Sequence, residues 1–118
     1  ITLMITLKED PVIQNLDKEK VLNLFDEIPY EEGRIATKTL VRDDKLNMTL
    51  ASFSGKQELS THAAPGDALV LALDGEARIV IDEEEYIVKK GESIIMPGGI
   101  PHSVHVDSLF KMLLIVSK

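Results

Sequence analysis

Short apolar segments separated by turn-forming residues follow one another at close intervals from residue 34 onward. Many of these segments alternate apolar and polar positions, which is typical of β-strands with one buried face. Asp, Ser, Pro and Gly lie between them, and these residues favour turns. The pattern predicts strands at Arg34–Arg42, Leu46–Phe53, Ala68–Leu73, Glu76–Ile81, Glu85–Val88, Ser93–Met96, His102–Val106 and Leu109–Val116. Such regular spacing favours an all-β sandwich or barrel.

The dipeptide Asp74-Gly75 lies between two of these apolar segments and is the strongest hairpin signal in the chain. A type I′ turn needs positive φ at both central positions, which Asp-Gly tolerates. We therefore predict a two-residue hairpin there. That register would place Val70 opposite Ile79 and Ala72 opposite Ala77, all facing the barrel interior.

The first third of the chain has a different pattern. Residues Ile1–Leu7 alternate apolar residues and Thr for most of their length, which predicts a strand. Asp17 is a candidate N-cap for a short helix that runs to Asp26. The apolar side of this helix would consist of Val21, Leu24 and Phe25. We therefore expect an N-terminal extension over residues 1–33 and a barrel domain over residues 34–118.

Composition narrows the functional classes. The 118 residues suit one domain, and the net charge of −7 argues against a nucleic-acid surface. No apolar run approaches the roughly 20 residues of a membrane helix, and Ile1–Leu7 lacks the features of a secretory signal. The absence of cysteine excludes disulfides and thiolate chemistry and suits the cytoplasm. The chain does not begin with Met, which makes Met4 a candidate native start.

One motif stands out between Gly91 and His102. It reads G-x5-P-x-G-x2-H, in which Gly91 turns the chain into a short apolar strand. Pro97 ends that strand because proline cannot donate to a β-ladder. Gly98 and Gly99 reverse the chain, and His102 begins the next strand.

This run resembles the second motif of the cupin family as far as the histidine, although the final Asn position holds Val106. The first cupin motif is present in weakened form between Gly55 and Gly75. Its first histidine position falls on His62, with six rather than five residues after Gly55. Its second histidine and its glutamate positions fall on Ala64 and Ala68. The resemblance covers about residues 34–116 and implies a double-stranded β-helix, or jelly-roll barrel, of the small single-domain cupin type.

Complete cupin sites hold a divalent metal, often Mn, Fe, Ni or Zn, with three histidines and one glutamate. Here only His62 and His102 match ligand positions, and catalytic metal sites normally have at least three protein ligands. Asp67 is a candidate third ligand, but strand alternation favours its role as a turn residue. Alternation also predicts that His105 faces outward. A divalent metal is therefore an optional cofactor in this interpretation.

The predicted interior around the two histidines is apolar, and a pocket of this kind suits a small ligand. The candidate ligand-binding residues are His62, His102, Val70, Ile79 and Val104. The leading hypothesis is a small cupin that binds a sugar-like or organic-acid metabolite. A metal-dependent isomerase or dioxygenase and a protein-interaction or sensor module are the alternatives, so the sequence leaves open whether this is an enzyme. We also expect a homodimer, in which the N-terminal extension protects a sheet edge of the partner.

Overall fold

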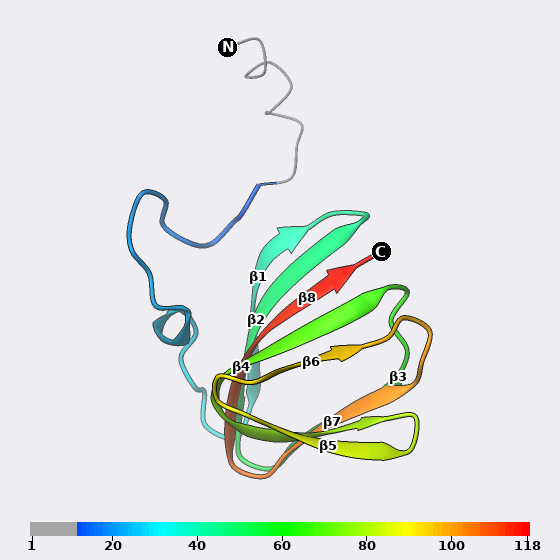
Figure 1. The fold of residues 1–118 in the computed structure, drawn as a ribbon. Coiled ribbons are helices and arrows are strands. Elements are labelled where there is room, and N and C mark those ends of the chain that lie inside the picture. Colours follow the sequence, from blue (N-terminus) through cyan, green and yellow to red (C-terminus); the bar gives the residue numbers. More distant parts are fainter. Residues whose placement is uncertain (1–11) are drawn as a thin grey trace.

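The computed structural model describes residues 12–118 (Figure 1). Within these residues, one short 3₁₀-helix precedes eight strands. The elements are η1 (Leu24–Glu27), β1 (Ile35–Arg42), β2 (Leu46–Ser54), β3 (Gln57–His62), β4 (Asp67–Ile81), β5 (Glu84–Lys89), β6 (Ser93–Met96), β7 (His102–Val106) and β8 (Leu109–Ser117). No helix in this part of the chain is long and apolar enough to cross a membrane.

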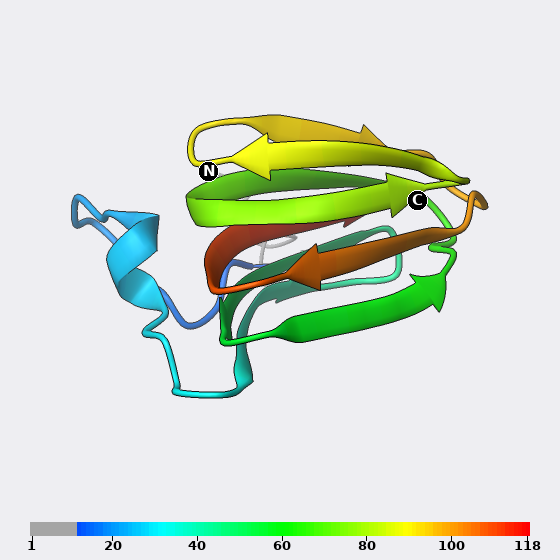
Figure 2. The ribbon, with the colours of Figure 1, turned by 90° about the horizontal axis from the view of Figure 1, so that it is seen from below.

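The strands form one curled antiparallel sheet in the order β1-β2-β8-β4-β7-β3, with β5 and β6 also paired to β4. The first half of β4 pairs with β8 and β6, and its second half pairs with β5 and β7. Strand β4 therefore belongs to both halves of the barrel, which face each other across the interior (Figures 1 and 2). The predicted all-β barrel is confirmed.

The predicted hairpin at Asp74-Gly75 is wrong, because β4 runs through it as a single strand. Its register shifts by a bulge between Ala72 and Asp74, and Gly75 has a positive φ of 69°. A Cβ atom on Gly75 would lie 1.9 Å from the carbonyl oxygen of Leu109, so the two backbones approach closely here. The Asp-Gly pair thus bends one long strand between the two sheet halves, and does not reverse it.

The predicted pairings of Val70 with Ile79 and of Ala72 with Ala77 are consequently wrong. Val70 pairs with Leu114 and Ile94, whereas Ile79 pairs with Tyr86 and Val104. All four residues are nevertheless buried in one core cluster. Strict alternation would turn two side chains that are an odd number of residues apart toward opposite faces. The bulge shifts the alternation by one residue, so Ala77 and Ile79 face the core as Val70 and Ala72 do.

Strand β3 was absent from the sequence-based prediction, and it pairs with β7. Most of its residues are exposed, as expected of a polar edge strand with few apolar residues. The pairing has a register shift between Leu59 and His62 and ends with His62 opposite His102. This missing strand therefore positions one of the two candidate histidines.

Residues 12–34 form a segment that packs against the outside of the barrel, and we call it the N-terminal strap (Figure 2). The predicted helix from Asp17 is wrong. The helical turn begins only at Leu24, Asn23 is its N-cap, and Val21 is 98% exposed. Val21 and Asn23 are mediocre helix formers, and a helix this short is marginally stable. The predicted strand at Ile1–Leu7 lies outside the described residues.

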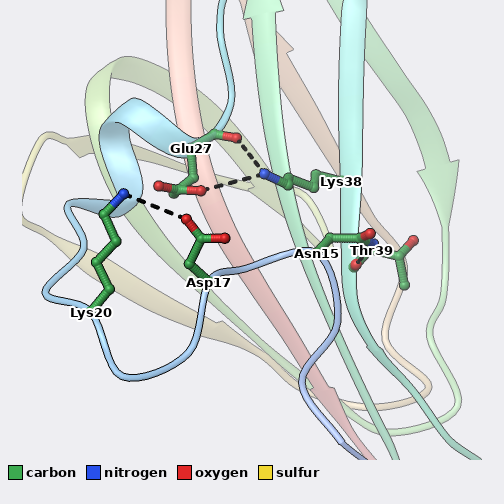
Figure 3. Close-up of polar contacts among 6 residues, drawn as sticks. All are labelled: Asn15, Asp17, Lys20, Glu27, Lys38 and Thr39. Atoms are coloured by element: carbon green, nitrogen blue, oxygen red, sulfur yellow. Dashed lines mark hydrogen bonds and ion pairs between the residues drawn. The ribbon is translucent and has the colours of Figure 1, made fainter.

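Polar contacts attach the strap to β1 (Figure 3). The Nδ2 of Asn15 donates a 2.6 Å hydrogen bond to the carbonyl oxygen of Thr39. The Nζ of Lys38 donates to the carbonyl oxygen of Glu27 at 3.1 Å and lies 3.4 Å from the Oε1 of the same residue. Leu16, Leu24 and Ile28 belong to an apolar cluster with Leu40, Leu50 and Leu113. The strap thus covers part of the outer face of the sheet.

Candidate functional site

A cavity of about 60 Å³ lies in the barrel interior. Its wall is apolar apart from two imidazole rings, which belong to His62 at the end of β3 and His102 at the start of β7. The apolar part of the wall includes Val70, Val104, Met96 and Met112. No carboxylate or basic side chain other than the imidazoles is among the lining residues of this cavity in the described chain.

The two imidazole rings are direct neighbours. Their centroids lie 4.5 Å apart, and the ring planes meet at 66° in an edge-to-face arrangement. His102 is 3% exposed, whereas His62 is on the exposed side of the cavity mouth. The pairing of β3 with β7 brings them together, since the two residues are register partners. One ring is therefore deep in the wall and the other borders solvent.

The backbone sets the tautomer of both rings in the same way. The Nδ1 of His62 lies 2.8 Å from the carbonyl oxygen of Ser60, and the Nδ1 of His102 lies 3.3 Å from that of Ile100. A carbonyl oxygen only accepts, so each Nδ1 must carry the hydrogen and donate it. The Nε2 atom of each neutral ring is then left with a free lone pair. The pair of rings consequently offers two hydrogen-bond acceptors.

The pKa of His102 is lowered from its ordinary value. Burial is the main cause, because removing water disfavours the charged imidazolium. The neighbouring His62 lowers this pKa further, and the hydrogen bond to Ile100 opposes both effects. At neutral pH the buried imidazole is therefore uncharged.

The two remaining ligand positions of the resemblance also face the cavity, where they hold Ala64 and Ala68. Among residues 12–118, no three His, Asp or Glu side chains are grouped so that they could hold a metal ion. Within the same residues, no buried side-chain nitrogen or oxygen lacks a hydrogen-bond partner. The donor set of two imidazoles does not fit a divalent metal that needs at least three protein ligands.

Asp67 lies at the barrel rim rather than beside the imidazoles. Its Oδ1 accepts a 2.9 Å hydrogen bond from the backbone nitrogen of Gly98, and this contact ties the start of β4 to the turn before β7. Asp67 does not line the cavity. Its contact is the one expected of a turn residue, so the carboxylate is already engaged in holding two loops together.

Ile79, a candidate ligand-binding residue, and His105, which alternation predicts to face outward, both lie away from the cavity wall. Ile79 is fully buried in the core but is not among the residues that line the cavity. His105 is on the opposite face of β7 from His102, and its side chain is 21% exposed. There the Nε2 of His105 is 2.9 Å from the Oγ of Ser103, and its Nδ1 is 3.6 Å from the Oε1 of Glu58. His105 is thus placed outside the barrel interior.

Sequence reasoning missed Leu59, a cavity-lining residue on β3. The signal for this strand was weak, because Leu59 is the only strongly apolar residue between Gln57 and His62. Its place on the wall follows from the pairing with Val104 on β7. Polar edge strands of this sort carry little hydrophobic periodicity.

Comparisons with known proteins agree with this architecture. The sequence profile described as Cupin domain matches residues 50–116. The structure is similar to a conserved protein of unknown function from Streptococcus pyogenes, with 42% sequence identity and a TM-score of 0.88. That match covers 91% of this chain and 94% of the other.

Two further solved structures are similar. A cupin superfamily protein from Desulfitobacterium hafniense is 28% identical with a TM-score of 0.85, and the match covers 89% of this chain and 96% of that one. A cupin 2 conserved barrel domain protein from Leptotrichia buccalis is 48% identical with a TM-score of 0.80. The match covers 82% of this chain but only 47% of the Leptotrichia chain. No match was found among curated proteins. The profile match, together with these barrels, shows that the chain belongs to the cupin family.

Proposed function

We propose that the barrel binds a small neutral molecule with hydroxyl groups, of the sugar-like class, and that binding needs no metal. The observation that carries this proposal is the pair of imidazoles, 4.5 Å apart, in an otherwise apolar wall. Two Nε2 acceptors fix the orientation of hydroxyl donors, and the apolar wall contacts the carbon skeleton. A few polar groups in an apolar cavity are the usual composition of small-ligand sites.

The size of the cavity limits how the ligand enters. A volume of about 60 Å³ is far below the roughly 300–1,000 Å³ of ordinary small-ligand pockets, so the cavity holds only a small part of a metabolite. One end of the ligand would therefore enter between the imidazoles, with the rest at the mouth beside His62. Met96 and Met112 line the wall, and methionine side chains adapt readily to a bound group.

The charge of the wall favours a neutral ligand over an organic acid. Among residues 12–118, no Lys or Arg lines the cavity, and burial lowers the pKa of His102. A bound carboxylate would therefore meet no fixed cation from these residues near neutral pH. An organic acid would gain affinity as the pH falls, because it would bind the imidazolium form. A hydroxyl ligand would lose affinity over the same range, because protonated Nε2 no longer accepts a hydrogen bond.

A thermal-shift screen with monosaccharides, polyols and small organic acids tests the proposal. A ligand that binds only the folded state raises the melting temperature. We expect a response to a sugar or polyol, stronger at pH 7.5 than at pH 5.5, that is lost in His62→Ala and His102→Ala. The matched control is His105→Ala, which changes a histidine outside the cavity and should leave the response intact. A response that survives both cavity substitutions would contradict the proposal.

The metal-dependent isomerase or dioxygenase remains the alternative from the enzyme class. It would require a metal held by His62 and His102 together with water or groups from elsewhere. Metal analysis of protein purified without chelators separates the two hypotheses, because stoichiometric metal that disappears in both histidine variants would favour the enzyme. The interaction or sensor module predicts a stable protein partner and no small-molecule response. A cytoplasmic location stays a prediction from the cysteine-free sequence.

A further inference from the structure

The half of the barrel formed by β5, β4, β7 and β3 has two adjoining hollows on its outer face. Their volumes are about 660 Å³ and about 160 Å³. Arg78, His105 and Asp107 line both hollows, so we treat the two as one feature and call it the outer groove. None of the residues that line it also lines the interior cavity. The outer groove is therefore a separate feature with the volume of an ordinary ligand pocket.

Strand register places Arg78 at the centre of this face. Ala77 and Ile79 are buried in the core, so alternation directs the side chain of Arg78 outward. Arg78 is the register partner of His105 on β7 and of Ile87 on β5. The guanidinium group thus has an imidazole on one side and an apolar side chain on the other.

A second cation lies diagonally across from Arg78. Val88 is buried, so alternation directs Lys89 outward on β5. Lys89 is the register partner of Glu76, which is two residues before Arg78 on β4. Diagonal neighbours of this kind lie about 7–8 Å apart on a sheet. This spacing allows one anionic group to lie between Arg78 and Lys89 and to contact both.

The charge balance of the outer groove differs from that of the chain as a whole. The sequence has 13 basic and 20 acidic residues. In the groove, Lys and Arg residues outnumber carboxylates. The cations are Lys56, Arg78, Lys89 and Lys90, and the carboxylates are Glu58, Glu76 and Asp107. A concave surface with an excess of one charge raises the local concentration of ligands of the opposite charge.

Part of this cationic surface is not neutralised by neighbouring side chains. Glu85 accepts a 2.9 Å hydrogen bond from the Nη1 of Arg78, and the guanidinium group retains further N–H donors. Neither Lys89 nor Lys90 forms an ion pair with another of residues 12–118. These donors are consequently available to a ligand.

We propose that the outer groove binds a small organic dianion whose charged group lies between Arg78 and Lys89. Phosphate monoesters and dicarboxylates share this chemistry. Their oxygen atoms would accept charge-assisted hydrogen bonds, which are stronger than those between neutral groups. Ile87 and Leu109 line the larger hollow, are 51% and 42% exposed, and offer contacts to the carbon skeleton. The outer groove thus takes a class of ligand for which the described wall of the interior cavity has no Lys or Arg.

The test is an NMR titration of the backbone amides at pH 7.5 with inorganic phosphate, succinate and acetate. Ionic strength is held constant, so that general screening is the same at every point. We expect saturable shifts at the amides of Arg78, Lys89 and His105 with phosphate, succinate or both. The tighter of these two probes identifies the source of the dianion. Acetate, a monoanion, should bind much more weakly.

Matched variants separate the groove from the net charge of the protein. Arg78→Gln and Lys89→Gln should each weaken binding of the better probe by about threefold to tenfold, the range expected for one exposed charged contact. Lys45→Gln makes the same change of charge outside the groove and should leave the affinity unchanged. Glu76→Gln removes the carboxylate opposite Lys89, so it should tighten binding. His62→Ala should have no effect, which makes the result independent of the function proposed for the cavity.

Four results would overturn the proposal. They are the absence of saturable shifts with both dianions, shifts centred outside the groove, an equal response to acetate, and equal weakening in Lys45→Gln and Lys89→Gln. Circular dichroism establishes that each variant is folded. If Arg78→Gln is not, because its contact with Glu85 is lost, Lys89→Gln and Glu76→Gln decide the question, since both change exposed side chains.

Discussion

The ammonium group of Lys111 lies 3.8 Å from the centre of the Phe25 ring, and its Nζ donates a 2.7 Å hydrogen bond to the Phe25 carbonyl oxygen. The centre of the Tyr30 ring lies 4.6 Å from the same ammonium group. Lys111 belongs to β8 and is only 4% exposed. The Tyr30 hydroxyl in turn donates to Asp74 on β4. Burial, and after it this contact with Asp74, raises the Tyr30 pKa. A buried cation thus joins the N-terminal strap to the barrel.

Replacement of this cation should weaken the attachment of the strap. Lys111→Met keeps most of the aliphatic stem but leaves the Phe25 carbonyl without its donor, so we expect a loss of about 1.5–3 kcal/mol in the free energy of unfolding. Urea denaturation measures this change. The control is Lys90→Met, whose Nζ lies 6.0 Å from the same ring and which should cost less than about 0.5 kcal/mol. Equal losses in the two variants would mean that the contact contributes little.

The bend in β4 should depend on glycine. Gly75→Ala would bring a Cβ within 1.9 Å of the Leu109 carbonyl oxygen at a φ of 69°, so the two strands must separate. We expect a loss of about 3–5 kcal/mol or failure to fold. Gly33→Ala is the matched control, because its φ is 70° but nothing lies within 4 Å of the added carbon. This variant should lose only about 1–2 kcal/mol, the cost of the left-handed backbone. Similar losses would show that the close approach is relieved easily.

The burial of His102 should make the barrel sensitive to mild acid. The pKa of His102 is lower in the folded chain than its ordinary value of 6.5, so the unfolded chain binds a proton more readily. Full stability is therefore present above pH 6.5 and is lost as the pH falls through the folded pKa. Urea midpoints between pH 8 and pH 5.5 measure the slope.

The histidine variants separate the causes of this slope. His102→Leu should remove its contribution, whereas His62→Leu should only reduce it, because burial of His102 is the larger cause of the lowered pKa. A slope unchanged in His102→Leu would show that other groups produce the acid sensitivity.

Much of the barrel could be predicted from the sequence because its strands have a strong apolar pattern. The boundaries of β1, β6, β7 and β8 agree with the prediction to within one residue. The failures have physical causes. Asp74-Gly75 has the local chemistry of a hairpin, but the pairing of β4 with β8 continues through it by a bulge. Local turn preference was overridden by pairing with strands distant in the sequence.

In the candidate site, too, the residues set by local sequence were predicted better than those set by long-range strand pairing. Motif spacing identified His62 and His102, but their 4.5 Å separation depends on β3, a strand with little apolar pattern. Ile79 was assigned to the ligand wall from the incorrect hairpin register, and it is core. Residues fixed by motifs were therefore easier to place than residues fixed by register.

Two alanines on the cavity wall occupy positions at which a complete cupin site has metal ligands. Ala64 and Ala68 line the same cavity as His62 and His102, at the positions where the motif would have histidine and glutamate. The double substitution Ala64→His and Ala68→Glu would raise the number of ligands from two to four. We expect this variant to bind about one divalent ion per chain, while the wild type binds far less, because three or four protein ligands are the usual minimum.

Metal analysis after dialysis against Mn²⁺, Ni²⁺ or Zn²⁺ measures the gain, and chelator should lower the melting temperature of the loaded variant only. The single substitution Ala68→Glu is the control for an added carboxylate without a third imidazole, and it should bind more weakly. A wild type that retains one ion per chain after the same dialysis would mean that two imidazoles recruit further ligands. A folded double variant without metal would mean that the cavity wall does not direct these four side chains to one point.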